Sequence, residues 1–336
     1  MSTIYVAVDG GLILVRDGEG AEVLTEPPAP ISLAADPEHP ERVWCGTDGT
    51  GVWRSQDAGR SWRSLEGPLA EARVSAVAVR PGGGAIYAGT DPSALWRSDD
   101  GGRSWSRLDA LNRLPSAPTW SFPPRPESSH VRWITIDLAD PDRLYVCIEA
   151  GALIRSIDAG ETWSDRVADG PWDTHTLLMH TDAPGRLYSA AGDGFSSPGR
   201  GYNQSDDRGD SWTRPDDGID RHYLYGMAVD PGDPDTVVVS AAHSPRAAHD
   251  AGTADATIFR RTGAGPWREV RQGLPDPRGT NRALLATCAG EPGTFYAASN
   301  RGLFRSGDGG SGWEPVLAPL PAPVGGRSTA AAIATP

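Results

Sequence analysis

The chain has 336 residues, and it lacks long apolar runs, cysteine-rich segments and any excess of basic residues. No apolar run approaches the ~20 residues that a membrane helix needs, so a helical membrane protein is not indicated. The start, Met1 to Val6, has no basic region and no cleavage site, and we therefore expect no signal peptide. The formal net charge of −13 argues against nucleic acid and anionic membranes as partners.

Cysteine is also scarce. Cys45, Cys147 and Cys288 are an odd number of residues at wide spacing, and Cys45 and Cys147 lie in apolar, strand-like runs. This pattern favours buried free thiols over a disulfide framework. Together with the missing signal peptide, it leads us to expect a cytoplasmic protein, and we expect it to be a monomer.

Glycine, proline and tryptophan are plentiful, with 41, 30 and 12 copies. An octet, Ser-x-Asp-x-Gly-x-x-Trp, recurs along the chain, and such self-similarity is the signature of repeat folds. Two degenerate copies are Phe259 to Trp267 and Val15 to Gly18. The five complete copies run from Ser55 to Trp62, Ser98 to Trp105, Ser156 to Trp163, Ser205 to Trp212 and Ser306 to Trp313.

The octet has the chemistry of a tight hairpin turn. Its Asp can accept backbone N–H groups across the turn, its Gly supplies a positive φ, and its Trp returns to bury a large apolar surface. The octet aspartates are therefore predicted to form turns and not to act as catalytic acids. They are Asp57, Asp100, Asp158, Asp207 and Asp308.

Each complete octet follows two further strand patterns, and the residues after its Trp supply a fourth strand. Four strands per repeat of roughly 40–50 residues indicate a propeller blade. Inner strands are expected to begin near Ile31, Val74, Arg132, Thr174, Tyr223, Ala283 and Thr329. We therefore predict an all-β fold over residues 1–336, a single seven-bladed β-propeller with four-stranded antiparallel blades. The C-terminal strand, Thr329 to Ala334, would complete the N-terminal blade and remove open sheet edges.

The octets resemble the Asp-box, or BNR, repeats of sialidases, xyloglucanases, sortilin-type receptors and the photosystem II assembly propeller. The resemblance covers nearly the whole chain and implies the fold, whereas function lives in sites grafted on the fold. The Phe/Tyr-Arg-Ile-Pro element of sialidases is missing, because the chain contains no Arg-Ile-Pro. Sialidase activity is therefore not expected. Xyloglucanases of this type have two propellers, whereas this chain predicts one.

Long insertions point to one face of the predicted propeller. Residues 109–130 enter the third blade, and residues 194–204 and 242–257 join the second and third strands of the fourth and fifth blades. All three lie at the blade ends opposite the octets. Long loops in compact domains are commonly functional, so we expect the site on this face.

Polar side chains at the starts of inner strands and the ends of second strands are expected to form a funnel. Two chemical interpretations of this funnel compete. In the first, His175, His222 and Glu149 bind a divalent metal, because mixed His and carboxylate ligands suit such ions. In the second, arginines clamp an anion, aromatic side chains stack on it, and a His–carboxylate pair moves a proton. A third interpretation is that these groups only satisfy one another around a water-filled channel. The candidate catalytic residues are His175, His222, Asp173, Glu149 and Tyr223, and the candidate ligand-binding residues are Arg132, Trp133, Arg282, Tyr202 and His243.

The sequence thus predicts a propeller that binds a small molecule or glycan, with hydrolase or lyase chemistry as the enzymatic classes considered. The alternative is a non-catalytic scaffold that binds a protein or peptide on the looped face, with Trp120 and Phe122 as anchors.

Overall fold

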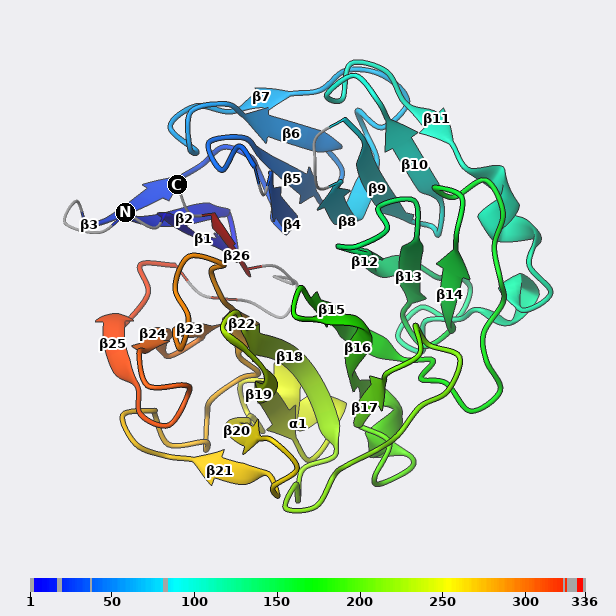
Figure 1. Cartoon of the computed structure of the whole chain (residues 1–336). Helices are drawn as coiled ribbons and strands as arrows, with labels where there is room; N and C mark the ends of the chain where they lie inside the picture. The colour runs from blue at the N-terminus through cyan, green and yellow to red at the C-terminus, as the bar shows by residue number, and fades with distance from the viewer. Residues whose placement is uncertain are drawn as a thin grey trace. The chain divides into compact units, whose positions relative to one another are not determined.

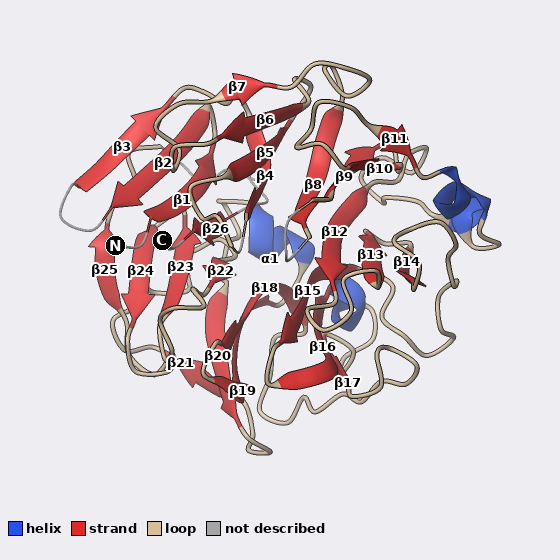
Figure 2. Cartoon of the chain, turned by 45° about the horizontal axis from the view of Figure 1, so that its top comes forward, coloured by secondary structure: helices blue, strands red, loops and turns tan. Residues whose placement is uncertain are grey.

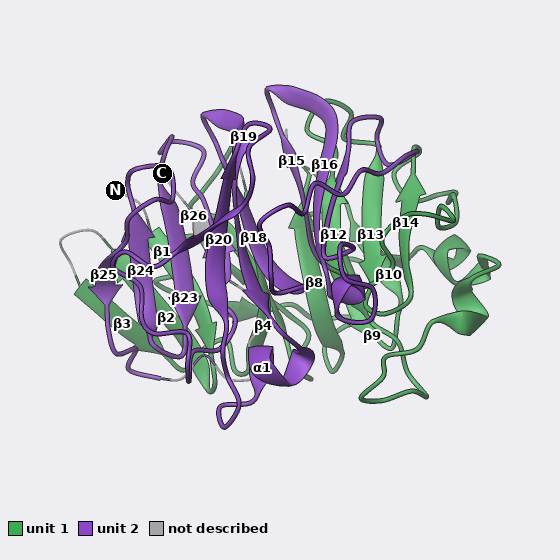
Figure 3. Ribbon diagram, turned by 90° about the horizontal axis from the view of Figure 1, so that it is seen from below, with its two compact units in different colours: residues 1–174, 328–336 green, residues 175–327 purple. Residues whose placement is uncertain are grey.

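The computed structural model describes residues 3–16, 20–36, 38–80, 84–322, 324 and 331–334 (Figure 1). Strands make up nearly all of its regular structure (Figure 2). The chain divides into two compact units, residues 1–174 with 328–336 and residues 175–327 (Figure 3). No described helix is long and apolar enough to cross a membrane.

Seven antiparallel sheets form the blades of a β-propeller, as predicted. Blades are numbered here from the sheet that begins at residue 30. The first unit holds blades 7, 1, 2 and 3. Blade 7 consists of β26 (Ala331–Ala334), β1 (Thr3–Val8), β2 (Gly11–Arg16) and β3 (Gly20–Leu24); blade 1 of β4 (Pro30–Ala35), β5 (Val43–Thr47), β6 (Val52–Ser55) and β7 (Arg63–Ser64); blade 2 of β8 (Arg73–Val79), β9 (Ile86–Asp91), β10 (Leu95–Ser98) and β11 (Ser106–Arg107); and blade 3 of β12 (Val131–Ile136), β13 (Leu144–Ile148) and β14 (Ala152–Ser156).

The second unit holds blades 4, 5 and 6. Blade 4 consists of β15 (Thr174–His180), β16 (Ala183–Ala191) and β17 (Tyr202–Ser205); blade 5 of β18 (Tyr223–Asp230), β19 (Asp233–Ala242), β20 (Thr257–Thr262) and β21 (Arg268–Val270); and blade 6 of β22 (Leu284–Ala286), β23 (Phe295–Ser299), β24 (Gly302–Ser306) and β25 (Glu314–Leu317). The long insertions carry short helices: η1 (Asp109–Arg113), η2 (Ala117–Thr119), η3 (Gly192–Phe195) and α1 (Pro245–His249).

The chain closes as the sequence predicts, by pairing its last strand with its first. β26 pairs antiparallel with β1, with Ala334 opposite Thr3 and Ala331 opposite Val6. Two residues of the predicted strand, Thr329 and Ala330, lie outside the described residues, as do Asp17 and Gly18 of the first degenerate octet. β1 therefore has a partner on both sides, which protects its edge from pairing with other chains.

The prediction of four strands in every blade is wrong for blades 3 and 4, which have three. Their fourth strand is reduced to single bridges, between Arg155 and Ser164 and between Gln204 and Thr213. In blade 4, Pro215 follows within two residues of the bridge, and proline cannot donate a ladder hydrogen bond. In blade 3, the carboxylate of Asp165 instead accepts the N–H of Ser116, 2.8 Å away. This contact draws the chain toward the 109–130 insertion.

The octets form the predicted turns. In the fourth copy, Asp207 Oδ1 accepts the hydroxyl of Ser205 at 2.7 Å and the N–H of Ser211 at 2.9 Å, and Oδ2 accepts the Ser211 hydroxyl at 2.6 Å. Ser205 Oγ in turn accepts the N–H of Gly209 at 2.8 Å. Hydrogen bonds from Ser211 hold the pKa of Asp207 at about 2. The carboxylate is therefore committed to the turn, as predicted.

The octet glycine lets each turn lie against the preceding blade. A Cβ on Gly59 would approach Cε1 of Tyr5 to 2.5 Å, and Gly59 has a φ of +78°. Both features favour glycine. The three cysteines are free and buried, as expected, and burial raises the thiol pKa of Cys45 and Cys147.

Side-chain hydroxyls join the innermost strands of successive blades. Ser32 Oγ donates to Val74 O at 3.2 Å, and Ser75 Oγ donates to Val131 O at 2.7 Å. Thr176 Oγ1 in blade 4 makes the same bond to Tyr225 O in blade 5, at 2.8 Å. The accepting strands β8, β12 and β18 have register shifts at these points, so the bonds occur where the regular ladder is interrupted.

Removing one of these bonds is expected to weaken the packing of two blades. Ser75→Ala leaves the buried carbonyl of Val131 without the hydroxyl that now donates to it, and we expect a loss of about 1–2 kcal/mol in the free energy of unfolding. Urea denaturation of the variant measures this loss. Ser64→Ala, at an exposed position of β7, is the matched control and should change little. Equal stability of the two variants would contradict the role of the hydroxyl.

Candidate functional site

In the first unit, acids at the ends of second strands bind arginines that enter the next blade. Asp48 accepts two 3.0 Å hydrogen bonds from Nη1 of Arg73. Arg73 Nε also lies 3.4 Å from Oδ2 of Asp91. Asp91 is nearly buried and also binds Arg125 and the hydroxyl of Ser128. Carboxylates and arginines therefore form ion pairs along this end of blades 1 to 3.

The predicted residues Glu149 and Arg132 continue this pairing. Glu149 Oε2 lies 2.7 Å from Nε2 of His130 and 3.6 Å from Nε of Arg132. The side chain of Arg132 is 4% exposed and that of Glu149 is 13% exposed. The His130 ring packs against Phe122 in a T-shaped arrangement, with ring centroids 4.8 Å apart. In this unit, the geometry matches the interpretation in which the polar groups satisfy one another.

The remaining candidates of the first unit have structural contacts. Asp173 Oδ1 accepts the N–H of Ala150 at 2.8 Å, and Ala150 has a positive φ of 52°. Trp133 lies half-buried on β12, opposite Cys147. The proposed peptide anchor Trp120 is buried, and its Nε1 donates to Ser116 Oγ at 3.0 Å, so it is not available to a partner. That part of the sequence prediction is wrong.

In the second unit, a cluster of histidine and tyrosine side chains joins blades 4 and 5. Tyr223 Oη lies 3.4 Å from Nε2 of His175 and 3.3 Å from Nε2 of His249. His175 Nδ1 lies 2.7 Å from the carbonyl oxygen of Leu224. Because a carbonyl only accepts, Nδ1 carries the hydrogen of this bond, and Nε2 is the ring atom that faces the Tyr223 hydroxyl.

Tyr225 and Arg282 complete this histidine–tyrosine cluster. Tyr225 shares a face with Tyr223, since alternate residues of a strand point the same way. Its ring lies 4.7 Å from that of His175 and 5.0 Å from that of His249. The Arg282 guanidinium lies 4.5 Å from the Tyr225 ring centroid, within the range of a cation–π contact. His175 and Arg282 are each 1% exposed, so His249, on α1, is the most accessible member of the cluster.

The structure separates other candidates from this cluster. Tyr202 lies in the core between blades 4 and 5, with its ring 4.9 Å from that of Trp267. His243 is half-exposed and lies 3.8 Å from Asp255. His222 precedes β18 and is only partly buried. Glu149 belongs to the first unit and His175 and His222 to the second, and the divalent metal site built from these three residues stays a prediction.

A groove of about 740 Å³ lies among loops of blades 5 and 6, in the second unit. Its walls are the 251–255 loop and the 276–279 loop, which are held together by the hydrogen bonds Gly279 N to Ala254 O, 2.7 Å, and Ala256 N to Thr280 O, 2.9 Å. Both loops lie at the blade ends opposite the octets. We call it the arginine groove, because its lining includes Arg221, Arg271, Arg278 and Arg301.

Sequence reasoning did not select the groove arginines. They are spread over 80 positions of sequence and follow no shared motif, although each lies in a loop of the predicted site face. The turn Asp276-Pro277-Arg278-Gly279 is the one local signal, since it projects a cation from a tight turn. The sequence likewise does not mark Tyr225 and His249 as site residues.

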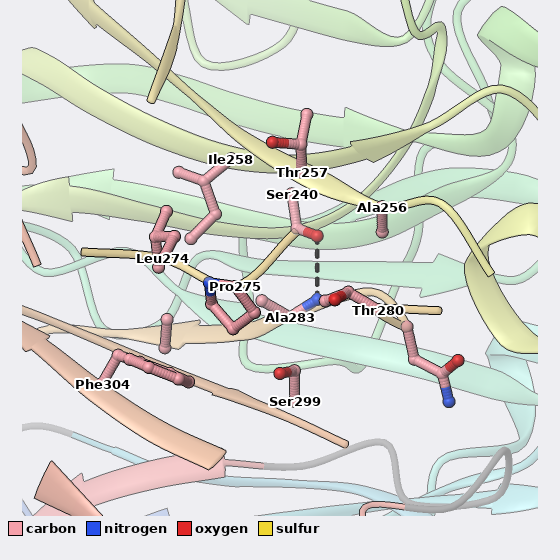
Figure 4. A pocket seen from close by; sticks show the side chains of 12 residues that line it. Ser240, Ala256, Thr257, Ile258, Leu274, Pro275, Thr280, Ala283, Ser299 and Phe304 are labelled. Carbon is pink, nitrogen blue, oxygen red and sulfur yellow. Dashed lines mark hydrogen bonds between the residues drawn. The ribbon is translucent and has the colours of Figure 1, made fainter. Parts of the chain in front are cut away.

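A smaller cavity lies deeper between blades 5 and 6 and has a volume of about 30 Å³ (Figure 4). Ser240 lies at its wall and accepts the N–H of Ala283 at 2.8 Å, the dashed line in the figure. Ile258, Leu274 and Phe304 supply apolar wall. This volume suits one or two water molecules and excludes a glycan or a metabolite.

Comparison with known proteins places the fold among β-propellers. No protein-family model matches the sequence, and no curated protein matches it significantly. Among solved structures, the chain is similar to the GH74 enzyme of Niastella koreensis, with a TM-score of 0.72 and 18% identity over 95% of this chain and 53% of the enzyme. The GH74 xyloglucanase of Xanthomonas campestris gives 0.70 and 18% identity over 94% and 52%. The chain thus spans about half the length of these enzymes.

A third similar structure is a propeller in complex with a peptide. YCF48 bound to a D1 peptide gives a TM-score of 0.57 and 19% identity, over 86% of this chain and 82% of YCF48. At these identities the likeness concerns the fold alone.

Proposed function

We propose that the protein is an Asp-box propeller that binds a small-molecule or glycan-type ligand on the face opposite its octets. The observation that carries the proposal is the arginine groove. Its volume of about 740 Å³ falls within the range of ligand sites, roughly 300–1,000 Å³. It lies between the 242–257 insertion and the loop that enters blade 6, on the face where the long insertions predict a site.

The octet turns and the similar GH74 enzymes support the Asp-box assignment and a glycan-type ligand. Acid–base chemistry, of the hydrolase or lyase class, would fall to the histidine–tyrosine cluster. The hydroxyl of Tyr223 lies 3.4 Å from Nε2 of His175 and 3.3 Å from Nε2 of His249, and imidazole and phenol groups at such distances can serve as general acids and bases.

Filling the arginine groove is expected to abolish ligand binding. Gly252 lies in the groove wall with a non-positive φ, and the nearest atom to an added Cβ is Asp250 Oδ1 at 3.4 Å, so a larger side chain fits the backbone. Gly252→Trp should weaken binding at least tenfold, which corresponds to about 1.4 kcal/mol. The measurement is titration calorimetry with oligosaccharides that include cellotetraose and trigalacturonic acid.

Ala168→Trp, at an exposed loop position of the first unit, is the matched control and should bind like the parent protein. If both tryptophan variants bind every tested oligosaccharide with the parent affinity, the groove is not the binding site.

A protein or peptide ligand is the second candidate function. It is favoured by the similarity to YCF48, a propeller solved with a peptide, and by the exposed aromatic side chains of Trp172 and Phe195, at 51% and 55%. Binding of a peptide library to the parent protein, lost in Trp172→Ala or Phe195→Ala, would favour this function over the first.

A further inference from the structure

The arginine groove has more positive than negative charge, although the whole chain has a net charge of −13. Its lining contains four arginines and two aspartates. Asp255 is already matched, because Arg221 Nη2 lies 3.4 Å and His243 Nε2 3.8 Å from its carboxylate. Arg271 is matched by Glu269 at 2.8 Å. Arg278, Arg301 and Asp276 remain, so the two arginines together leave an excess of one positive charge in the groove.

Arg301 is held in place by neutral oxygen atoms. Its Nη2 donates to the carbonyl of Arg278 at 3.1 Å, and its Nε lies 3.4 Å from Oγ1 of Thr280. Gly279 makes room for it, since a Cβ there would lie 2.4 Å from Nη2. These contacts fix the direction of the guanidinium without neutralising its charge, and a fixed arginine loses little entropy on binding.

Arg278 stands on a turn that the structure also fixes. Its N–H donates to Oδ1 of Asp276 at 2.8 Å, and Gly279 N donates to Ala254 O. The Arg278 side chain is exposed and makes no ion pair with any residue that the structure describes.

Arg221 supplies a buried donor at the groove. Its side chain is 10% exposed, and its Nη1 donates to the carbonyl of Asp255 at 2.6 Å. Its Nε has no hydrogen-bond partner within the described part of the chain. The contacts of Arg221 with the carbonyl and carboxylate of Asp255 therefore hold its guanidinium as a fixed part of the groove wall.

We propose that the arginine groove is an anion site that takes the carboxylate or phosphate group of a small molecule or saccharide. The planar guanidinium fork matches both groups, and charge-assisted bonds are stronger than neutral ones. This inference rests on the proposed function and adds the chemical class of the ligand: an acidic saccharide or a sugar phosphate, in preference to a neutral glycan.

The test replaces the two arginines that carry the excess positive charge and leaves the size of their side chains nearly unchanged. Arg278→Gln and Arg301→Gln, singly and together, are compared with Arg63→Gln and Arg113→Gln, two exposed arginines of the first unit. Calorimetry uses trigalacturonic acid as the carboxylate probe, glucose 6-phosphate as the phosphate probe and cellotetraose as the neutral probe. Arg278→Gln alone removes no hydrogen bond of the fold, so its loss of binding cannot be attributed to unfolding.

We expect at least one anionic probe to bind the parent protein. Each groove variant should bind this probe at least tenfold more weakly than the parent, and binding to the parent should weaken as the ionic strength rises. The two control variants should bind like the parent. The anionic probe that binds more tightly shows whether the groove prefers a carboxylate or a phosphate group.

Two results would overturn the inference. One is the failure of both anionic probes to bind the parent protein at millimolar concentration. The other is equal binding by the groove variants and the parent. A third result separates the two proposals: cellotetraose binds the parent protein, Gly252→Trp abolishes this binding, and the glutamine variants leave it unchanged. The groove then binds ligands and the proposed function stands, but the anion assignment fails.

Discussion

Gly226→Ala is expected to destabilise the protein by about 1–3 kcal/mol, which is large for the addition of one methyl group. Gly226 lies on β18, within the register shift between Leu224 and Met227. A Cβ at this position would lie 2.2 Å from Ala283 O and 3.2 Å from Leu285 N. Both atoms belong to the backbone of blade 6, which cannot rotate away as a side chain could. The strands of blades 5 and 6 must therefore separate, with the cost of overpacking and of lost contacts around them.

The measurement is urea denaturation of Gly226→Ala beside Gly290→Ala. Gly290 also has a non-positive φ, and the nearest atom to its Cβ is Cys288 Sγ at 3.8 Å, so the control should stay within about 0.5 kcal/mol of the parent. Similar stability of the two variants would mean that blades 5 and 6 are not packed this closely. Because Ala283 lies next to Arg282, the same variant should also alter the histidine–tyrosine cluster.

The sequence predicts the fold because the octets are local. Ser205, Asp207, Gly209 and Ser211 lie within seven positions and bond to one another, so their spacing alone specifies the turn. Five such turns set the length of the repeat and so the blade count. The missing fourth strands depend on single events outside the pattern, such as the contact between Asp165 and Ser116, 49 positions apart.

The candidate site is predicted less well, because its side chains meet through tertiary contacts. The sequence indicates His175 and Tyr223, since both stand at the start of inner strands, and the structure brings them together. Tyr202, a candidate ligand-binding residue in the 194–204 insertion, lies in the core instead. The arginine groove depends on which loops lie side by side, and the hydrogen bond between Gly279 and Ala254 that joins them has no counterpart in sequence spacing.

Low pH is expected to destabilise the folded protein by protonating the aspartates of its octets. Hydrogen bonds in the folded state lower the pKa of each octet Asp, that of Asp207 to about 2. A lowered pKa means that the unfolded chain takes up a proton first as the pH falls. The stabilisation by these carboxylates is therefore complete above the ordinary Asp pKa, near 4, and is lost as the pH falls toward 2. The free energy of unfolding should fall steeply across this range.

Asp207→Ala separates this effect from general acid denaturation. At pH 7 the variant loses three hydrogen bonds to the carboxylate, from the Ser205 hydroxyl and from the N–H and hydroxyl of Ser211, and we expect a loss of about 1–3 kcal/mol. Near pH 2 the parent carboxylate is itself becoming protonated, so the difference between variant and parent should shrink. Asp220→Ala removes an exposed carboxylate of the same unit and should show no such dependence. A difference that stays constant from pH 7 to pH 2 would mean that the charge of Asp207 contributes nothing to the turn, and that its stabilising effect lies in packing alone.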